Sequence, residues 1–392
     1  MLTSIALIFL VGMFLGWVFK RFGLPSLTGM IVTGIILGPY ALNMLDDTIL
    51  TISPDLRQIA LVIILFRAGL SLEIEDLKKN GFSAILMSFV PAVFEITGVI
   101  LLGRFLFNLS IIESAVMGTV LAAVSPAVIV PSMIHIIEEK YGQERKVPQL
   151  ILAGASMDDI FVIVLFSSFL SLALGNQVSA ASFIEIPVAI VMGILGGWIT
   201  GWLAQKFYRN FHMNDSSKII MLLSISFLLL AFEETLAGVI PFSGLLAIMA
   251  MGLTINQLYP ELAKRLSTKY NQLWIAAQIL LFVLVGATVD LSYALNAGGS
   301  ALLLISIALV FRMVGVLISL IPSKLTKKEK AFTMISYTPK ATVQAAIGGV
   351  PLAMGLGSGQ TILTVAVLSI LITAPIGSFA IEKTYRKLLR KS

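Results

Sequence analysis

Two consecutive aspartates, Asp158 and Asp159, lie in the middle of the apolar segment AGASMDDIFVIVLF. Neighbouring residues of a helix point about 100° apart, so the two carboxylates cannot face one point but can border one cavity. Close carboxylates in a low dielectric raise each other's affinity for protons. A hard cation such as Na⁺ needs oxygen ligands, and a carboxylate supplies them best when it is ionised. Proton and cation therefore compete for the same oxygens, which predicts coupled exchange at this pair.

Four further ionisable residues lie inside apolar segments, namely Arg67, Glu95, Arg312 and Lys340. An ionisable residue at the centre of a membrane helix costs about 2.5–3.5 kcal/mol on insertion scales, so a function or a pairing is expected for each. Arg312 stays charged at any accessible pH, and Glu95 is its predicted partner. Lys340 is predicted to offset the dipoles of interrupted helix ends. A static alternative remains open, in which the aspartates only neutralise Lys340 and Arg312.

Prolines interrupt two of the apolar segments. TVLAAVSPAVIVPSM contains Pro126 and Pro131, and MISYTPKATVQAAIGGVPLAMG contains Pro339 and Pro351. A proline inside a helix removes a hydrogen bond and clashes with the carbonyl one turn earlier. Unpaired carbonyls at membrane depth are tolerated only within protein or beside a watery cavity. Such breaks in corresponding positions of two halves indicate a transport site, although ordinary proline kinks remain the alternative. The carbonyls near Val124 and Ser125, and the Ser125 hydroxyl, are predicted to be further cation ligands.

The elements that position these residues are membrane helices. Of the 392 residues, 58% are hydrophobic and only 12% are charged, whereas a soluble domain has about 25% charged residues. Apolar stretches of roughly 20 residues recur along the chain, and lipid requires such stretches to be helical. The thirteen predicted spans are 2–19, 24–43, 56–72, 82–107, 111–136, 148–173, 182–205, 217–234, 239–257, 270–289, 298–321, 329–355 and 359–381. The expected fold is an all-α polytopic membrane protein.

The loops predict the orientation of the chain. With thirteen spans, all loop and tail lysines and arginines fall on one side except Arg57 and Arg104. The positive-inside rule then places the N-terminus outside and the C-terminus in the cytoplasm. Loops are short, so a single transmembrane domain is expected over 1–392. An odd span count with a spacer near 182–205 favours a six-plus-six inverted repeat.

Several segments together resemble the monovalent cation/proton antiporter superfamily. FGLPSLTGMIVTGIILGP resembles its second-helix signature, and LFRAGLSLE, VSPAVIVPSM, GASMDDI and YTPKATVQAAIG most resemble its NHA branch of sodium(lithium)/proton antiporters. The resemblance covers almost the whole chain. It implies a homodimer, an elevator-like movement, and unwound helices that cross at the two interrupted spans. It also implies a core bundle including about 56–173 and 270–381, with dimerisation helices including about 1–43 and 182–257.

The resemblance also assigns roles to single residues. Asp159 corresponds to the principal cation ligand, Asp158 to its proton-competing neighbour, and Glu95 to the ion-pair partner of Arg312. Arg312 stands where electrogenic relatives have a lysine. An arginine does not release its proton at accessible pH, so electroneutral exchange becomes possible. Lys340 could carry a second proton instead, so the stoichiometry stays open.

The predicted function is therefore exchange of Na⁺ or Li⁺ for H⁺, in the service of salt tolerance and pH homeostasis, and not an enzymatic reaction. A K⁺/H⁺ exchanger or a gated cation channel is the main alternative, and an organic-anion symporter and an intramembrane aspartyl protease are weaker ones. The expected partners are membrane lipid, a second copy of the chain, monovalent cations and protons. No cofactor and no nucleic acid is expected, since the basic residues lie in loops. The short chain favours the plasma membrane of a prokaryotic cell.

Overall fold

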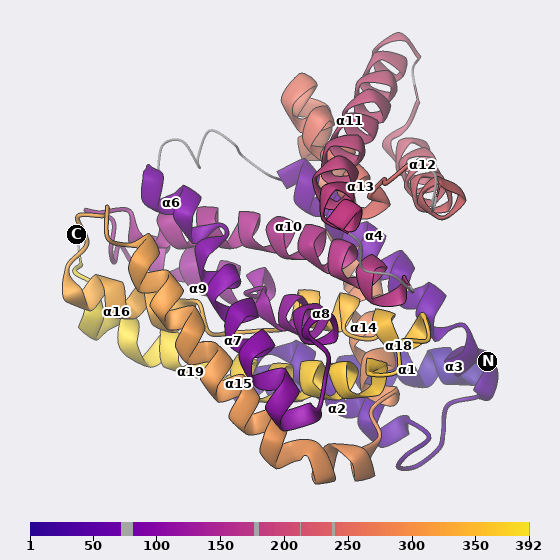
Figure 1. Ribbon diagram of the computed structural model, residues 1–392. Helices are drawn as coiled ribbons and strands as arrows, with labels where there is room; N and C mark the ends of the chain where they lie inside the picture. Colours follow the sequence, from indigo (N-terminus) through magenta and orange to yellow (C-terminus); the bar gives the residue numbers. More distant parts are fainter. Residues whose placement is uncertain (72–80, 176–179, 212, 237–239, 392) are drawn as a thin grey trace. The chain divides into compact units, whose positions relative to one another are not determined.

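Helices make up almost all of the described chain. The computed structural model describes residues 1–71, 81–175, 180–211, 213–236 and 240–391 (Figure 1). Within these residues the extended contacts are limited to one isolated bridge between Tyr141 and Lys391. Nine helices of the described part are long and apolar enough to cross a membrane, and three shorter apolar helices accompany them. The predicted all-α polytopic fold is therefore confirmed.

The chain divides into two compact units. Unit 1 consists of Met1–Pro54, Ile74–Val162 and Ile279–Ser392, and unit 2 of Asp55–Glu73 and Ile163–Gln278. The helices of unit 1 are α1 (Leu2–Arg21), α2 (Ser26–Leu37), α3 (Asp47–Thr51), α6 (Phe82–Met87), α7 (Val90–Phe107), α8 (Ile111–Ala122), α9 (Pro126–Glu138), α15 (Leu291–Ser319), α16 (Lys327–Ser336), α17 (Thr342–Ile347), α18 (Val350–Ala353) and α19 (Gly359–Leu388). Unit 2 contains most of α4 (Ser53–Ser71), and all of α11 (Ala180–Asn210), α12 (Asp215–Leu236) and α13 (Gly244–Leu258). The boundary between the units falls inside α10 (Val147–Leu174) and α14 (Pro260–Ala287).

Each predicted span falls on a helix or on a row of short helices. The span at 82–107 consists of α6 and α7, that at 111–136 of α8 and α9, and that at 329–355 of α16, α17 and α18. The largest boundary error concerns α14, which begins at Pro260 rather than near 270. Its first turns contain charged residues, so hydropathy does not detect them although they are helical. The predicted domain division and the inverted repeat stay predictions.

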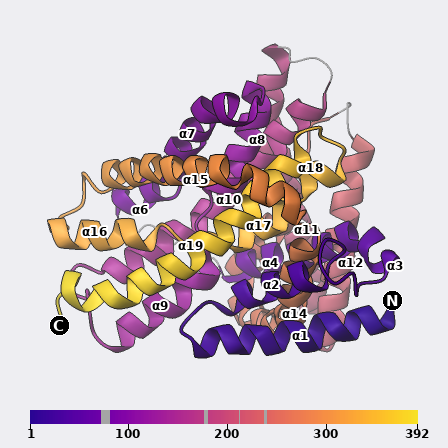
Figure 2. The same cartoon turned by 90° about the horizontal axis from the view of Figure 1, so that it is seen from below.

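Both predicted interruptions are present in unit 1, whose helices α8, α9, α16 and α17 are labelled in Figure 2. The helix stops after Ala122 and resumes at Pro126, and the second break separates α16 from α17. The Ser125 N–H donates to the Pro339 carbonyl at 2.8 Å, which joins the two breaks directly. Pro131 was expected to take part in the first break, but it lies inside the continuous helix α9. A proline removes only one hydrogen bond, and the packing of α9 retains the helix around it.

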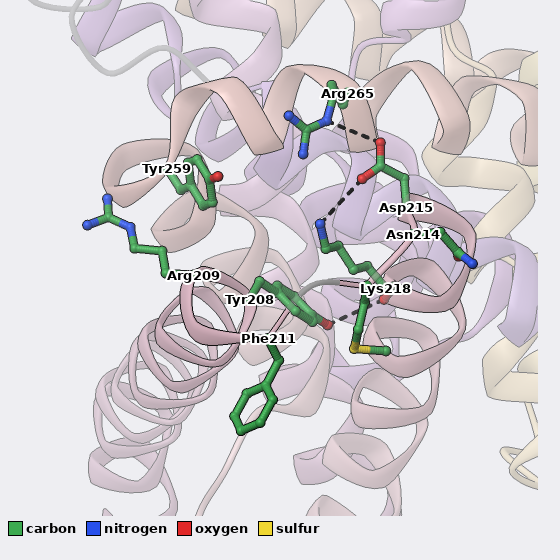
Figure 3. A pocket seen from close by; sticks show the side chains of 9 residues that line it. Tyr208, Arg209, Phe211, Asn214, Asp215, Lys218, Tyr259 and Arg265 are labelled. Carbon is green, nitrogen blue, oxygen red and sulfur yellow. Dashed lines mark hydrogen bonds and ion pairs between the residues drawn. The ribbon is translucent and has the colours of Figure 1, made fainter.

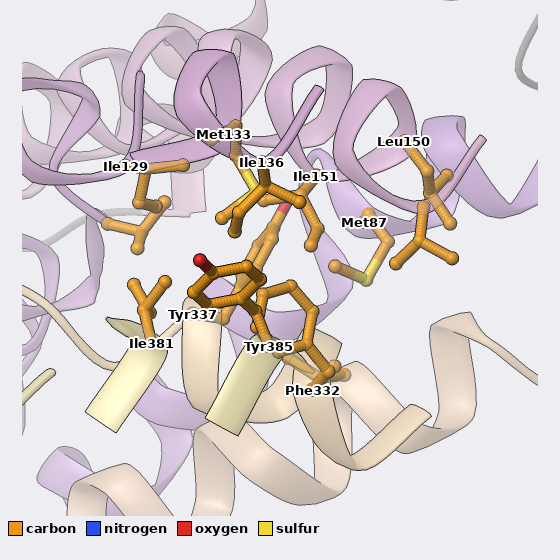
Figure 4. Close-up of a cluster of buried hydrophobic side chains, with 14 of the residues drawn as sticks. Met87, Ile129, Met133, Ile136, Leu150, Ile151, Phe332, Tyr337, Ile381 and Tyr385 are labelled. Atoms are coloured by element: carbon orange, nitrogen blue, oxygen red, sulfur yellow. The ribbon is translucent and has the colours of Figure 1, made fainter. Parts of the chain in front are cut away.

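An apolar cluster holds α9 and α16, one helix from each interrupted span, in place. Buried side chains from α6, α9, α10, α16 and α19 meet there (Figure 4), and these include Met87, Ile129, Met133, Ile136, Leu150, Ile151, Phe332, Tyr337, Ile381 and Tyr385. Between membrane helices such contacts stabilise through close van der Waals packing. The cluster therefore fixes α9 and α16, and with them one side of each break.

Polar contacts join α19 to the end of α9 beside this cluster. The Tyr385 hydroxyl donates to Glu139 Oε2 at 2.7 Å, and Arg386 Nη2 donates to Glu139 Oε1 at 3.0 Å. Hydrogen bonding from Tyr385, reinforced by Arg386, holds the pKa of the Glu139 carboxyl below its usual value. The Gly142 N–H also donates to the Arg390 carbonyl at 2.8 Å, so the end of the chain is attached to the turn after α9.

Replacing Glu139 by glutamine gives a pH-dependent loss of stability. A carboxyl whose folded pKa is depressed stabilises the protein above its unfolded pKa, and this contribution disappears as the pH falls through the folded value. We expect Glu139→Gln to lower Tm at pH 7 and the difference from wild type to shrink as the pH falls below 4.5, the usual pKa value for a glutamate. Melting curves in detergent between pH 3 and pH 8 measure this. Glu144→Gln, at an exposed position of the same turn, is the control, and a pH-independent difference at Glu139 contradicts the assignment.

Unit 2 is built on close packing of α11 against α13. A Cβ at Gly193 or Gly201 would lie 2.7 or 2.8 Å from a backbone oxygen of α13, and one at Gly197 would be closer still. Small residues at a spacing of four let two membrane helices approach backbone to backbone. The glycines of α11 are therefore packing residues.

Candidate functional site

Four buried charges form one cluster in unit 1. Glu95 comes from α7, Asp158 from α10, Arg312 from α15, and Lys340 from the break between α16 and α17. Glu95, Asp158 and Arg312 are 0% exposed and Lys340 is 1% exposed. Buried charges are costly unless they are paired. The two acids and two bases of this cluster neutralise one another.

Arg312 is the centre of the cluster. Its Nη1 donates to Glu95 Oε2 at 2.9 Å and its Nη2 to Asp158 Oδ2 at 2.7 Å. Its Nε donates to the Tyr337 carbonyl at 2.9 Å, and Nη1 also donates to the Ala122 carbonyl at the end of α8. The planar guanidinium offers five donors in a fixed arrangement, so Arg312 joins both breaks to two acids. A lysine at this position lacks the donors for these contacts.

Lys340 shares its acid with Arg312. Its Nζ lies 2.7 Å from Glu95 Oε1 and donates to Oε2 at 2.9 Å, so Glu95 bridges the two bases. The Lys340 N–H donates to the Thr373 hydroxyl of α19 at 3.0 Å, which satisfies a backbone donor left free by the break. The sequence predicted the Glu95–Arg312 pairing, but not that Lys340 would use the same carboxylate.

The two aspartates differ in their partners. Asp158 Oδ2 accepts from Arg312 and from the Val124 N–H at 3.0 Å, whereas its Oδ1 is buried without a partner. Asp159 is half-buried, forms no ion pair within the described residues, and has a buried Oδ1 without a hydrogen bond. Glu95 and Asp158 balance Arg312 and Lys340, and Asp159 is left over. With every group ionised, the charge cluster and Asp159 together carry one uncompensated negative charge.

The first break supplies neutral groups beside the aspartates. The Ser125 hydroxyl is 0% exposed and has no hydrogen-bond partner among the described residues, and the Val124 N–H donates to Asp158. All seven predicted site residues thus belong to unit 1: four form the charge cluster, Val124 and Ser125 lie in the first break, and Asp159 follows Asp158 in α10. Arg67, the other intramembrane base, lies in α4 of unit 2.

Sequence reasoning missed two neutral side chains at the site. Gln344 Nε2 donates to the Leu121 and Ala123 carbonyls. The Tyr337 ring lies 5.4 Å from the Arg312 guanidinium carbon, and its buried hydroxyl lies so close to Gly154 that a Cβ there would overlap it. The available signal was a polar residue one helical turn after Lys340 and an aromatic residue three residues before it.

A pocket of about 450 Å³ lies in unit 2 and shares no residue with the charge cluster (Figure 3). Its charged groups are one acid, Asp215, and three bases. Asp215 accepts from Arg265 Nε at 3.1 Å and lies 3.5 Å from Lys218 Nζ, and Arg209 donates to the Leu258 carbonyl. The acid of this pocket thus has two basic partners, whereas Asp159 forms no ion pair within the described residues.

Comparison with known proteins gives consistent matches along the whole chain. The family described as "Sodium/hydrogen exchanger, transmembrane" matches residues 5–387. The chain is 33% identical over 385 residues to sodium/hydrogen exchanger 9B2 of Homo sapiens, covering 94% of this chain and 70% of that protein. It is 32% identical over 388 residues to sodium/hydrogen exchanger 9B1 of Mus musculus, covering 94% and 67%. A solved structure of the sodium proton antiporter MjNhaP1 from Methanocaldococcus jannaschii superimposes with a TM-score of 0.86 at 20% identity, covering 99% of this chain and 98% of that one, and shares its fold.

Proposed function

Because the chain belongs to the sodium/hydrogen exchanger family, and to the NHA branch that its sequence predicted, we propose that it exchanges Na⁺ or Li⁺ for H⁺ across a membrane, with proton and cation competing at Asp158 and Asp159. The observation that carries the proposal is the single uncompensated carboxylate of the buried cluster, Asp159.

The charge balance explains why exchange would be coupled. An ionised carboxylate without a partner is costly in a low-dielectric interior. One proton or one monovalent cation removes the excess charge, and binding both would leave a net positive charge. The site therefore favours holding one or the other whenever it is closed to water. Movement of the loaded site between the two faces then exchanges the two ions.

Oxygen atoms are available for a small hard cation. Asp158 Oδ1, Asp159 Oδ1 and the Ser125 hydroxyl are buried and have no hydrogen-bond partner within the described residues. Unsatisfied buried oxygens are unfavourable by about 1–3 kcal/mol each, and coordination of Na⁺ or Li⁺ would satisfy them. The Val124 carbonyl is the backbone ligand that we propose beside them.

The wider proposal concerns movement and assembly. We propose alternating access by an elevator-like movement, with a homodimer in a prokaryotic plasma membrane, the N-terminus outside and the C-terminus in the cytoplasm. The loop charges support the orientation, and the two joined breaks support a transport site at membrane depth. Salt tolerance and pH homeostasis are the corresponding physiological roles.

Proteoliposome exchange tests the function. A pH gradient is imposed, Na⁺, Li⁺ or K⁺ is added in turn, and the lumenal pH is followed with and without a clamped membrane potential. We expect proton flux driven by Na⁺ and Li⁺, and its voltage dependence gives the stoichiometry. Flux driven by K⁺ alone would instead identify a K⁺/H⁺ exchanger. Absence of coupled flux with every cation would point to a channel or an organic-solute carrier.

A further inference from the structure

Side chains from other elements donate hydrogen bonds to the backbone carbonyls at the end of α8. The last four carbonyls of a helix have no partner within the helix. The Ala122 carbonyl accepts from Arg312 Nη1. Gln344 Nε2 donates to the Leu121 carbonyl at 3.2 Å and to the Ala123 carbonyl at 2.8 Å. Three consecutive carbonyls at the first break are therefore held by nitrogen donors of α15 and α17.

The amide of Gln344 can adopt only one orientation here. Both of its partners are carbonyl oxygens, so the nitrogen has to face them and Oε1 has to point away. Gln344 is 1% exposed, and its buried Oε1 has no hydrogen-bond partner in the part of the chain that the structure describes. A buried polar atom of this kind costs about 1–3 kcal/mol. An apolar side chain of the same size would avoid that cost, so packing alone does not account for a glutamine at this position.

The contacts of Gln344 change which carbonyls remain free. The Ser125 carbonyl accepts from the Val128 and Ile129 N–H groups at 3.2 and 3.1 Å. Among the hydrogen bonds of the described residues, none reaches the Val124 carbonyl. Between residues 121 and 125, Val124 therefore has the one carbonyl that nothing else holds, and it belongs to the residue whose N–H contacts Asp158.

We propose that Gln344 is a specificity-determining residue, which keeps the Leu121 and Ala123 carbonyls away from the transported cation and so limits the backbone ligands of the site to the Val124 carbonyl. The proposal rests on the cation/proton exchange proposed above. Few ligands in a tight site suit a small cation such as Li⁺ or Na⁺. A larger cation takes more oxygen ligands at longer distances, and Gln344 withholds two of them.

The test is Gln344→Met, which keeps the volume of the side chain but removes both donors. Releasing two carbonyls provides extra ligands for a larger ion. We expect the ratio of half-saturating concentrations, K⁺ to Na⁺, to fall by about tenfold, which corresponds to about 1.4 kcal/mol. The concentrations are measured as cation-dependent increases of Tm in detergent, with choline as the inert cation, and then as exchange in proteoliposomes. Thermal measurements report binding even where a variant transports slowly.

Gln205→Met is the matched control, because Gln205 is also a buried glutamine with an unpartnered Oε1 but belongs to α11 of unit 2. It should leave the ratio unchanged. Gln344→Leu repeats the test with a second apolar side chain that has no donor, so a shift in the same direction is expected. An unchanged ratio in whichever Gln344 variants fold, or an equal shift in Gln205→Met, overturns the inference. Absence of Na⁺-dependent flux in the wild type would instead refute the proposed function.

Discussion

Asp159→Asn abolishes Na⁺-driven and Li⁺-driven proton flux while the protein stays folded. Asparagine keeps the shape of the side chain but cannot bind a proton or balance a cation, so the cluster of Glu95, Asp158, Arg312 and Lys340 is neutral by itself. We expect exchange to fall to the level of empty liposomes. The stabilisation that Na⁺ gives the wild type, about 1.4 kcal/mol at ten times Kd, should also disappear. Persistence of full exchange would refute the assignment of the site.

The neighbouring residue provides the contrast. Asp158→Asn also removes one carboxylate, but it takes an ion-pair partner from Arg312. We therefore expect Asp158→Asn to lower Tm, and Asp159→Asn to leave the Tm measured without Na⁺ equal to the wild-type value or above it, because an unpaired buried charge is removed. Asp47→Asn, at an exposed position, controls for the loss of an aspartate. Equal effects of the two site variants on Tm would contradict the charge balance.

Arg312→Gln is expected to be the most destabilising single substitution in the cluster. It leaves Glu95 with Lys340 alone, leaves Asp158 without a cation, and frees the carbonyls of Tyr337 and Ala122. Removing one partner of a buried pair costs about 3–5 kcal/mol. The loss of thermal stability is measured by heating the protein in detergent and monitoring the folded fraction by size-exclusion chromatography.

The double variant Glu95→Gln/Arg312→Gln separates the pairs. Arg312→Gln leaves two acids, Glu95 and Asp158, against Lys340 alone, and removing Glu95 as well restores charge balance, so Tm should recover in part. Full recovery is not expected, because Asp158 remains unpaired and Lys340 has lost Glu95. Arg312→Lys keeps the charge but not the fork of donors, and it should fall between wild type and Arg312→Gln. Purely additive losses in the double variant would refute the pairing of Glu95 with Arg312.

The helices and the two breaks could be predicted from the sequence because both have local causes. Apolar runs of sufficient length have to be helical in lipid, and Pro126 and Pro339 prevent the backbone bonds that would continue two of them. Local reasoning failed where packing decides. Pro131 is accommodated inside α9, and the charged first turns of α14 are helical without being apolar.

The pairing within the site needed three dimensions. The ion pairs join residues 154 to 245 positions apart in the chain, and no spacing rule states which acid meets which base. Three acids and three bases permitted many pairings, and Arg67 proved to belong to the other unit. Gln344 carries no charge, so it does not stand out in the sequence as an ionisable residue inside an apolar segment. The sequence thus identified the charged residues of the cluster, whereas the structure determined which of them is left without a partner.

The double contact of Asp158 has a mechanical consequence. One carboxylate oxygen fastens α10 to the backbone at Val124 and to Arg312 of α15, directly beside Asp159. Turning α10 alone would carry Asp159 to a new position only by breaking the buried ion pair between Asp158 and Arg312. In the exchange proposed above, a movement that keeps these contacts would carry α7, α8, α15, the second break and the part of α10 that contains both aspartates as one rigid block. The carrier of the ion would then be a framework of helices rather than a single helix.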